Sequence, residues 1–220
     1  MIRSVFDHLS AHMKVHILVV DDNSPDGTAA VVEKLIQQFF GNTLFLRVRS
    51  GKLGMGTAYK EGFQWGLDKG YDLFVEMDAD LSHRPAYLPA MIDQIRQHDV
   101  VIGSRYVPGG GVKGWRLPRK LISKGGSLYA RFLLGLPIQD LTGGFNMWKR
   151  EVLEAINMSS VRSEGYAFQI ELKYKAHQLG FSLCEHPIIF EDRRAGKSKM
   201  SKRIVAEAML RVLQMKIREK

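Results

Sequence analysis

The sequence predicts an α/β fold, a single domain with a mostly parallel sheet and helices on both faces. Over roughly the first 100 residues, short apolar runs alternate with helical segments that are apolar on one face. Polar or glycine-rich loops follow the apolar runs, as is common at the carboxyl ends of parallel strands. The chain has 220 residues and is 45% hydrophobic, which suits one domain with a packed core.

The first half alternates strand and helix. The expected strands are residues 15–20, 44–48, 71–77 and 100–103. The expected helices between them are residues 29–40, 57–69 and 85–97. Ahead of the first strand, Val5, Phe6, Leu9 and Met13 share one helical face. Because a doubly wound sheet normally opens with a strand, we expect either that the reading frame as given starts late or that this sheet lacks its first member, which leaves unpaired backbone edges.

The second half is less regular and more basic. In chain order we expect a loop at 105–117, a helix at 121–136, a tight turn at 140–145, a helix at 164–179, a strand at 181–190, a basic loop at 193–199 and a final amphipathic helix at 201–218. Residues 1–104, 105–200 and 201–220 therefore differ in character within one domain of 1–220.

Composition narrows the classes of partner. Net charge is +9, and residues 193–220 hold ten Lys or Arg against two Glu. This asymmetry favours an anionic partner such as nucleic acid, acidic lipid or a phosphorylated ligand, with a solvated basic surface as the alternative. No apolar run approaches the roughly 18 residues of a membrane span. The one cysteine, Cys184, lies in a strand-like run and is expected to be a buried, unreactive thiol.

Two carboxylates at the end of the third strand are the leading candidate for chemistry. Asp78 and Asp80 follow an apolar segment, and Pro85 then begins a helix. Two hard oxygen donors at the tip of a strand suit Mg²⁺ or Mn²⁺ held together with a diphosphate. Asp22 ends the first strand and is expected to face the same cleft, whereas Asp26 suits the entry to a helix.

Three basic or glycine-rich features admit two interpretations each. The loop 51–56 is either a structural turn or a contact to phosphate through Lys52. The loop 193–199 either binds phosphate oxygens or is a solvated run of charge. The helices 121–136 and 201–218 either lie at a membrane interface or pack on the protein itself.

Six motifs in fixed order resemble the polyprenol-phosphate (dolichol-phosphate) mannosyltransferases of the family 2 glycosyltransferases. They are VVDDNSPDGT at 19–28, KLGMGTAY at 52–59, MDADLSH at 77–83, GSRY at 103–106, DLTGGF at 140–145, and Arg193, Gly196, Ser198, Lys199 and Met200 in the basic loop. The resemblance covers nearly the whole chain. It implies a GT-A, Rossmann-like fold with a nucleotide-binding half at 1–104 and an acceptor half at 105–200.

The resemblance also implies an activity and roles for residues. The activity is inverting transfer of mannose from GDP-mannose to a polyprenyl (dolichyl or undecaprenyl) phosphate with Mg²⁺ or Mn²⁺. Implied catalytic residues are Asp80, Arg105, Arg193 and Lys199. The same four are implied to bind the donor, together with Val20, Asp22, Lys52, Asp78 and Ala79. Implied acceptor-phosphate residues are Arg119 and Arg131, and implied metal ligands are Asp78, Asp80 and Ser82.

The resemblance leaves alternatives open. The family's opening strand, which contacts the nucleotide, has no counterpart here, and Asn146 stands where relatives often carry a basic residue. A transferase that uses UDP-glucose or another donor, or a truncated, weakly active or non-catalytic relative, therefore competes with the main hypothesis. Nucleic-acid binding rests on charge alone and is not expected. We expect a peripheral location at the cytoplasmic face of a membrane, with a membrane-anchoring subunit as a further expected partner.

Overall fold

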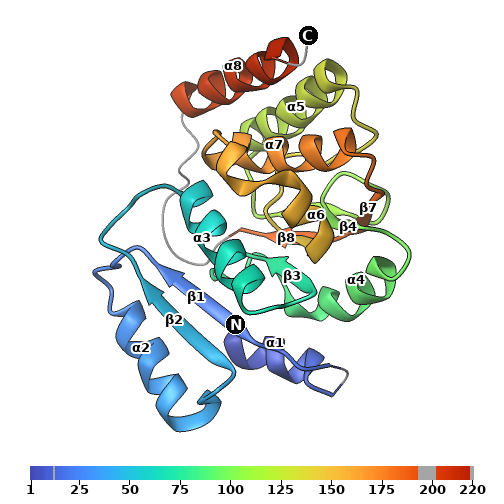
Figure 1. Cartoon of the computed structure of the whole chain (residues 1–220). Helices are drawn as coiled ribbons and strands as arrows, with labels where there is room; N and C mark the ends of the chain where they lie inside the picture. The colour runs from blue at the N-terminus through green and yellow to red at the C-terminus, as the bar shows by residue number, and fades with distance from the viewer. Residues whose placement is uncertain (12, 193–201, 219–220) are drawn as a thin grey trace.

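A computed structural model describes residues 1–11, 13–192 and 202–218 (Figure 1). The α-helices are α1 Ile2–Leu9, α2 Thr28–Leu35, α3 Met55–Asp68, α4 Leu88–Ile95, α5 Leu117–Leu134, α6 Arg150–Ile156, α7 Gly165–Gln178 and α8 Lys202–Arg218. The strands are β1 Ile17–Asp21, β2 Leu44–Val48, β3 Leu73–Glu76, β4 Val100–Ser104, β5 Gly111–Lys113, β6 Asn146–Lys149, β7 Leu183–Pro187 and β8 Ile189–Glu191. Short turns of other helix types are η1 Ile36–Phe40, η2 Pro85–Tyr87 and η3 Met158–Ser160.

The central sheet has the strand order β3-β6-β4-β7. β4 and β7 are parallel, whereas β6 runs antiparallel to both β3 and β4. Two further parallel pairs, β1 with β2 and β5 with β8, stand apart from it. The α/β class with mostly parallel pairing is thus confirmed, but β6 was not foreseen. β6 comes from the second half of the chain and lies between two strands of the first half, so the halves share one sheet.

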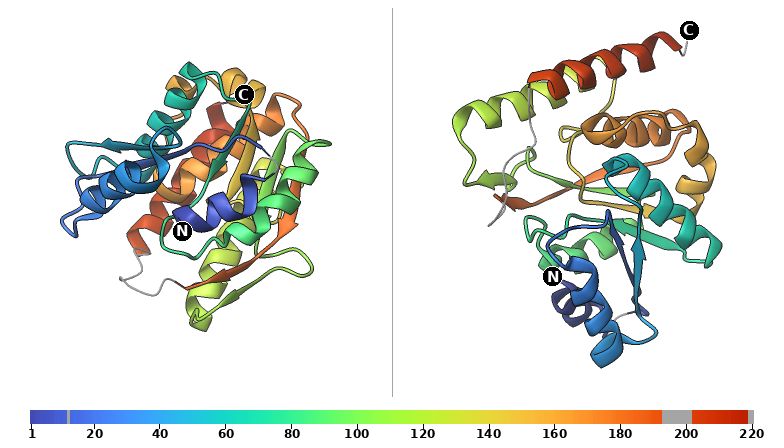
Figure 2. Two further views of the ribbon diagram at one scale, coloured as in Figure 1. Left: turned by 90° about the horizontal axis from the view of Figure 1, so that it is seen from below. Right: turned by 90° about the vertical axis from the view of Figure 1, so that its left-hand side faces the viewer.

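Alternate residues of the central strands pack into two separate hydrophobic cores. On one face, Val100 and Trp148 pack with side chains from α3, α5, α6, α7 and α8. On the other face, Val101 and Met147 pack with α4 and with Val5 of α1. This alternation is the period-2 pattern of a strand buried on both sides. Figure 2 shows the helices on both sides of the sheet, with α8 lying across one end of the molecule beside α5.

The sheet is interrupted where the sequence predicts a missing strand. Within the described residues β1 pairs with β2 alone, and β3 pairs with β6 alone, so each has one edge without a ladder. Helix α3 contacts both β1 and β3, which ties the two parts together on one side. On α1, Phe6 stacks on Phe40 of η1, with ring centroids 4.7 Å apart, while Val5 and Leu9 pack against α4. Packing of α1 and α3 therefore joins parts that no hydrogen-bonded strand connects.

Several expected boundaries differ from the structure. The expected strand at 181–190 is two strands, because β7 pairs with β4 up to Ser104 and β8 then pairs with β5. The expected helix at 121–136 begins earlier, at Leu117, because Pro118 suits the first turn of a helix. β5 lies inside the expected loop 105–117, and α6 directly follows β6.

Candidate active site

The residues after β3 form a closed turn that presents two carboxylates. The backbone N–H of Asp78 donates to Nδ1 of His83 at 3.0 Å. One oxygen of Asp80 accepts from the backbone N–H of Ser82 at 3.0 Å and also from its hydroxyl. Leu81 adopts a left-handed conformation, with φ of 67°, which reverses the chain between these bonds. The turn therefore fixes Asp78 and Asp80 relative to each other.

His83 supports this turn as a neutral imidazole. Its ring is buried, stacks on Phe145 at a centroid distance of 5.1 Å and meets the ring of Phe190 edge-on. Because Nδ1 accepts the N–H of Asp78, the ring proton is assigned to Nε2. Burial lowers the pKa of His83 below its usual value, which favours the same neutral form.

The carboxylate pair fits a divalent cation shared with a ligand. The hydroxyl of Tyr59 on α3 donates to Asp78 at 3.4 Å, and its pKa is raised well above the usual value, first by burial and then by the charges of Asp78 and Glu76. Negative charge is thus concentrated here. Among the described residues, no three His, Cys, Asp or Glu side chains are grouped to hold a metal. Mg²⁺ commonly takes one or two carboxylates and completes its shell with phosphate oxygens and water.

The role of Ser82 as a metal ligand stays a prediction. Its side chain is buried, and its hydroxyl donates to Asp80. This contact orients Asp80 whether or not Ser82 itself meets the ion. Ala79 lies between the two carboxylates, and its contact to the donor likewise stays a prediction.

A buried polar cluster lies two residues before the carboxylate turn. Glu76 accepts from the amide of Asn146 at 2.6 Å, the indole of Trp148 at 3.1 Å and the amide of Gln169 at 2.9 Å. Burial raises the pKa of Glu76 to about 7, although the amides of Gln169 and Asn146 act in the opposite direction. The cluster joins β3, β6 and α7, and so fixes the strand that carries Asp78.

Lys173 binds the backbone of the neighbouring turn at 140–145. This side chain of α7 is fully buried, and its ammonium donates to the carbonyl oxygens of Asp140, Leu141 and Gly143 at 3.3, 3.2 and 2.8 Å. Burial lowers the pKa of Lys173 to about 8, partly offset by the charges of Asp140 and Glu76. Three carbonyl dipoles on one cation fix the path of the 140–145 turn.

Arg105, a predicted catalytic residue, is bound to that turn. Its Nε and Nη2 atoms donate to the two carboxylate oxygens of Asp140, each at 2.6 Å, and Nη2 also donates to Thr142 at 2.9 Å. Both partners are buried, and the charge of Arg105 holds the pKa of Asp140 below its usual value against the effect of burial. The fork of Arg105 is thus used mainly inside the protein, and a further contact to the donor stays a prediction.

In the first half of the chain, Asp22 pairs with Arg49 and does not stand alone. Nε of Arg49 donates to Oδ1 of Asp22 at 2.6 Å. Val20 and Leu18 point toward Gly62 of α3, so their side chains face that helix. Lys52 is exposed in the loop before α3. Asp26 accepts from the N–H and hydroxyl of Thr28, the first residue of α2, which confirms its expected role at the entry to that helix.

Of the basic candidates in the second half, Arg119 and Arg131 are in the described part of the chain and lie apart on α5. Arg119 pairs with Asp192 at 2.8 Å and lies over the ring of Trp115 at 4.0 Å. Arg131 is exposed on the same helix, about 18 Å further along its axis at 1.5 Å per residue. Arg193 and Lys199 lie outside the described residues, so their predicted roles stay untested.

The sequence analysis did not identify two buried charged residues, although a charged residue inside an apolar segment is a usable signal. Glu76 stands inside the apolar run of β3, and Lys173 lies on a helix whose residues from Ala167 to Tyr174 are all buried. Such charges are rarely buried without a partner. Arg49 and Tyr59 gave no comparable signal, because their environments depend on segments distant in sequence. Cys184 is a free thiol whose pKa burial raises to about 11, which agrees with the expected low reactivity.

Comparison with known proteins gives consistent results. The model of glycosyl transferase family 2 matches residues 1–156. A polyprenol monophosphomannose synthase from Mycolicibacterium smegmatis is 48% identical over 206 residues, which span 93% of this chain and 77% of that protein. An undecaprenyl-phosphate mannosyltransferase from Micrococcus luteus is 44% identical over 196 residues, spanning 89% and 80%.

Solved structures show the same fold. Glucosyl-3-phosphoglycerate synthase from Mycobacterium tuberculosis, in complex with Mn²⁺, uridine diphosphate and glucosyl-3-phosphoglycerate, superposes with a TM-score of 0.64 at 19% identity. The superposition covers 98% of this chain and 74% of the synthase. The same enzyme with Mn²⁺ and UDP-glucose gives 0.63. The match to the family model over residues 1–156 and the 48% identity to a curated relative show that the chain belongs to glycosyl transferase family 2.

Proposed function

We propose that this chain transfers mannose from GDP-mannose to a polyprenyl phosphate with inversion at the anomeric carbon, assisted by Mg²⁺ or Mn²⁺. The observation that carries the proposal is the closed turn that fixes Asp78 and Asp80 beside β3, in a chain 48% identical to a polyprenol monophosphomannose synthase. Family membership supports glycosyl transfer, and the names of the relatives support the sugar and the lipid.

The chemistry asks for positioning of two anions. An oxygen of the acceptor phosphate forms the new bond to C1 of mannose, and the bond from C1 to the diphosphate breaks, so GDP leaves with the bonding electrons. A phosphate monoester is already anionic near pH 7, so no strong general base is needed. We assign Asp78 and Asp80 to the metal, with Ser82 orienting Asp80. When bound, the metal stabilises the negative charge of the departing diphosphate.

The remaining residues are assigned either to the donor or to the region between the donor diphosphate and the acceptor phosphate. On the donor side we assign Val20, Asp22 and Lys52 to the nucleoside and Ala79 to the sugar nucleotide. We assign Arg105, Arg193 and Lys199 to the region where donor diphosphate and acceptor phosphate meet. Their cations reduce the repulsion between two negatively charged reactants. For Arg105, the bidentate pair with Asp140 makes Nη1 the side of the guanidinium that a ligand would meet.

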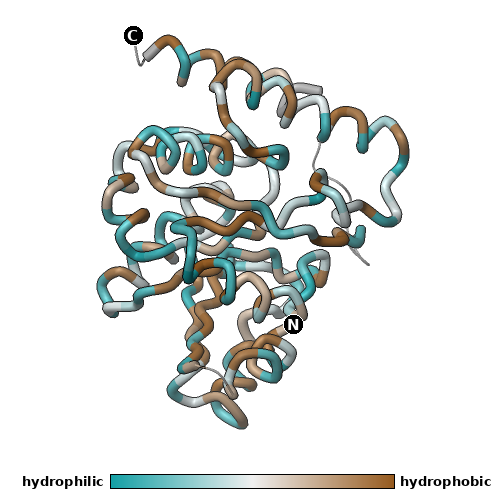
Figure 3. Tube along the Cα trace, turned by 90° about the vertical axis from the view of Figure 1, so that its right-hand side faces the viewer, coloured by the Kyte–Doolittle hydropathy of each residue, from teal (hydrophilic) through white to brown (hydrophobic). Residues whose placement is uncertain are grey.

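The α5–α8 end of the molecule is the proposed membrane side. Leu117, Leu121, Leu128 and Phe132 form one exposed stripe on α5 at spacings of four, seven and four residues, and Phe132 is 89% exposed. α5 contains no acidic residue. A helix with exposed apolar side chains and flanking cations suits the headgroup region of an anionic bilayer. Figure 3 shows hydrophobic positions recurring along α5 and α8.

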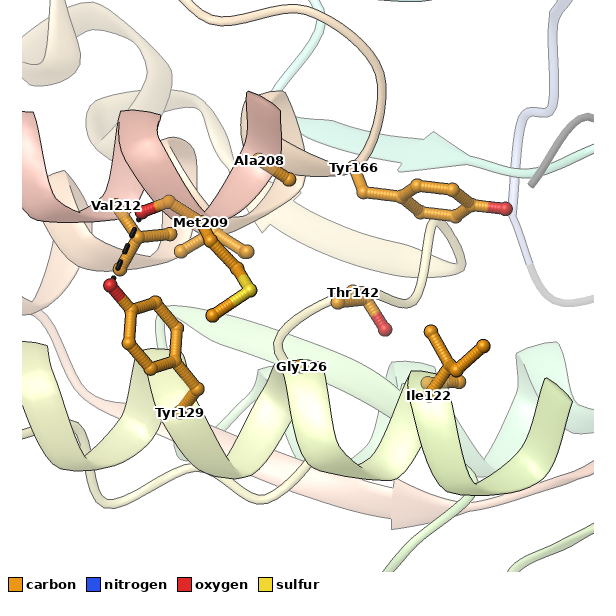
Figure 4. Close-up of a pocket in the computed structure, with 10 residues that line it drawn as sticks. Ile122, Gly126, Tyr129, Thr142, Tyr166, Ala208, Met209 and Val212 are labelled. Carbon is orange, nitrogen blue, oxygen red and sulfur yellow. Dashed lines mark hydrogen bonds between the residues drawn. The ribbon is translucent and has the colours of Figure 1, made fainter. Parts of the chain in front are cut away.

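An apolar groove at this end extends to the turn that binds Arg105. It lies between α5 and α8, lined by Tyr129 and Met209, and reaches Thr142, which accepts a hydrogen bond from Arg105 (Figure 4). We assign the first isoprene units of the acceptor to this groove. Arg119, at the start of α5, is then the nearer candidate for the acceptor phosphate. Arg131 lies further along α5, where the headgroups of the bilayer are the alternative partner.

Peripheral attachment at a cytoplasmic membrane face is part of the proposal. Among the residues that the structure describes, no helix is long and apolar enough to cross a bilayer. Attachment through α5 and α8 accounts for access to a lipid acceptor. A membrane-anchoring partner subunit would strengthen that attachment by adding a second contact to the bilayer.

A transfer assay tests the proposal. Purified protein is given a short polyprenyl phosphate and either GDP-mannose or UDP-glucose, with Mn²⁺, Mg²⁺ or EDTA, and the glycolipid is measured. We expect transfer from GDP-mannose that needs metal and that falls at least a hundredfold in Asp80→Asn. Asp93→Asn, at an exposed position of α4, is the matched control and keeps full activity. Transfer from UDP-glucose alone would replace the donor assignment, and full metal-dependent activity of Asp80→Asn would refute the metal assignment.

A further inference from the structure

Arg49 joins three separate segments at the carboxyl end of the β1–β2 pair. It directly follows β2, and only 3% of its side chain is exposed. Nε donates to Asp22 at 2.6 Å, Nη1 to the hydroxyl of Thr57 at 2.8 Å and Nη2 to the carbonyl of Gly54 at 3.0 Å. Its backbone N–H donates to the carbonyl of Asp21 at 2.8 Å. One guanidinium thus fixes the end of β1 against the first turn of α3.

The pairing determines which oxygen of Asp22 a ligand can meet. Both Nε and Nη2 of Arg49 lie on Oδ1 of Asp22, at 2.6 and 2.5 Å. The Asp22 side chain is 27% exposed, whereas that of Arg49 is almost completely covered. Arg49 therefore cannot itself reach a large ligand, but both of its contacts to Asp22 are made with Oδ1, which leaves Oδ2 for a ligand.

The same side chain also shapes the glycine-rich loop. Gly54 has φ of 103°, a conformation that a residue with a side chain rarely adopts, and its carbonyl is held by Arg49. The N–H of Gly56 donates to Glu164 at 2.9 Å, so this loop is fixed from both sides. A buried cation is costly unless it is fully paired, so such a residue is a poor choice for packing alone.

We propose that Arg49 is a positioning residue for nucleoside recognition: it orients Asp22 and fixes the 51–56 loop so that they receive the nucleoside half of the sugar nucleotide. This inference rests on the proposed function and adds to it the residue that sets the nucleoside pocket. Because Asp78 and Asp80 hold the other half of the donor, removing Arg49 weakens contacts to the nucleoside and leaves those to the metal and diphosphate unchanged.

The test separates the two halves of the ligand. Calorimetry measures binding of GDP and of inorganic pyrophosphate, each with Mn²⁺, to wild type, Arg49→Met, Arg49→Lys and Asp22→Asn. The matched control is Arg47→Met: Arg47 lies two residues earlier, pairs with Glu61 of α3 and has a side chain that is 54% exposed. Circular dichroism and thermal melting check that each variant is folded.

We expect Arg49→Met to bind GDP about 10- to 100-fold more weakly, the range for losing a hydrogen bond to a charged group, and to bind pyrophosphate as wild type does. KM for GDP-mannose rises by a similar factor with kcat within about twofold, since nucleoside binding is uniform to ground and transition states. Arg49→Lys, which keeps a cation beside Asp22 without the fork, recovers part of the loss. Arg47→Met changes neither affinity.

Distinct outcomes overturn distinct claims. If Arg49→Met weakens the affinities for GDP and for pyrophosphate equally, or changes neither affinity, Arg49 does not position the nucleoside site. If Arg49→Met does not fold, Asp22→Asn and Arg49→Lys carry the test, and an unchanged ratio of GDP to pyrophosphate affinity in both refutes the inference. In the folded case the double variant of Arg49→Met and Asp22→Asn loses no more GDP affinity than the larger single loss. A wild-type protein that binds neither ligand with Mn²⁺ refutes the proposed function instead.

Discussion

Replacing Asp140 by Asn tests whether the buried pair with Arg105 holds the 140–145 turn. The carboxylate accepts four hydrogen bonds, from Nε, Nη2 and the backbone N–H of Arg105 at 2.6, 2.6 and 3.0 Å and from the N–H of Gly143 at 3.1 Å. Asn keeps the shape but turns one acceptor into a donor and leaves the guanidinium buried without its counter-charge. We expect the free energy of unfolding to fall by about 3–5 kcal/mol, the usual cost of removing one partner of a buried pair.

The assay is urea unfolding followed by tryptophan fluorescence, since Trp115 and Trp148 are both buried. The control Asp93→Asn removes a carboxylate from an exposed pair and should change the free energy of unfolding by no more than about 1 kcal/mol. Replacing both Arg105 and Asp140 by apolar residues of similar size should destabilise much less than the sum of the single changes. A loss below about 1 kcal/mol in Asp140→Asn would show that water enters the site and that the turn is held by other contacts.

Two further predictions follow from the structure. Burial lowers the pKa of His83 below its unfolded value near 6.5, so the folded protein binds fewer protons than the unfolded chain in that range. The contribution of His83 to stability is therefore complete above about pH 6.5 and is lost as the pH falls below it. Urea midpoints of wild type should fall more steeply from pH 7 to 5 than those of His83→Gln, and equal slopes would contradict the assignment. A second prediction concerns the open edge of β1. The amides of Leu18 and Val20 point away from β2, whereas those of Ile17, Val19 and Asp21 point toward it, as alternation along a strand requires. Hydrogen exchange measured by NMR should therefore be faster at Leu18 and Val20, and equal protection would mean that the open edge of β1 is covered.

The alternation of apolar runs and helical faces was enough to predict most elements of the first half. Strands lie at the expected positions of β1 to β4, and the continuous apolar run of β4 is buried on both faces, with Val100 and Ile102 in one core and Val101 in the other. β6 was missed because Asn146 at its start reads as polar, although it is fully buried and bonded to Glu76 and Gln169. Its antiparallel position was beyond sequence pattern, since only the tertiary fold inserts it between β3 and β4.

For the site, the sequence located the carboxylates but not what fixes them. Asp78 and Asp80 were predicted because the carboxyl end of a strand in an α/β sheet is a position where ligands commonly bind. Their support comes from residues whose partners lie far along the chain: Glu76 and Gln169 are 93 positions apart, and Glu76 and Trp148 are 72 apart. No local period encodes such pairs, so motif spacing alone could not have identified them.

A charged residue inside an apolar segment still carries usable information. Glu76 and Lys173 are both buried, and each makes three hydrogen bonds, which is what the cost of burying a charge requires. Glu76 fixes the last residue of β3, two positions before Asp78, and Lys173 fixes the turn that binds Arg105. The polar cluster thus lies under the predicted donor site and not in the apolar cores at large. A buried, fully paired charge in this chain therefore marks a segment whose position the site depends on, even where the charge itself meets no ligand.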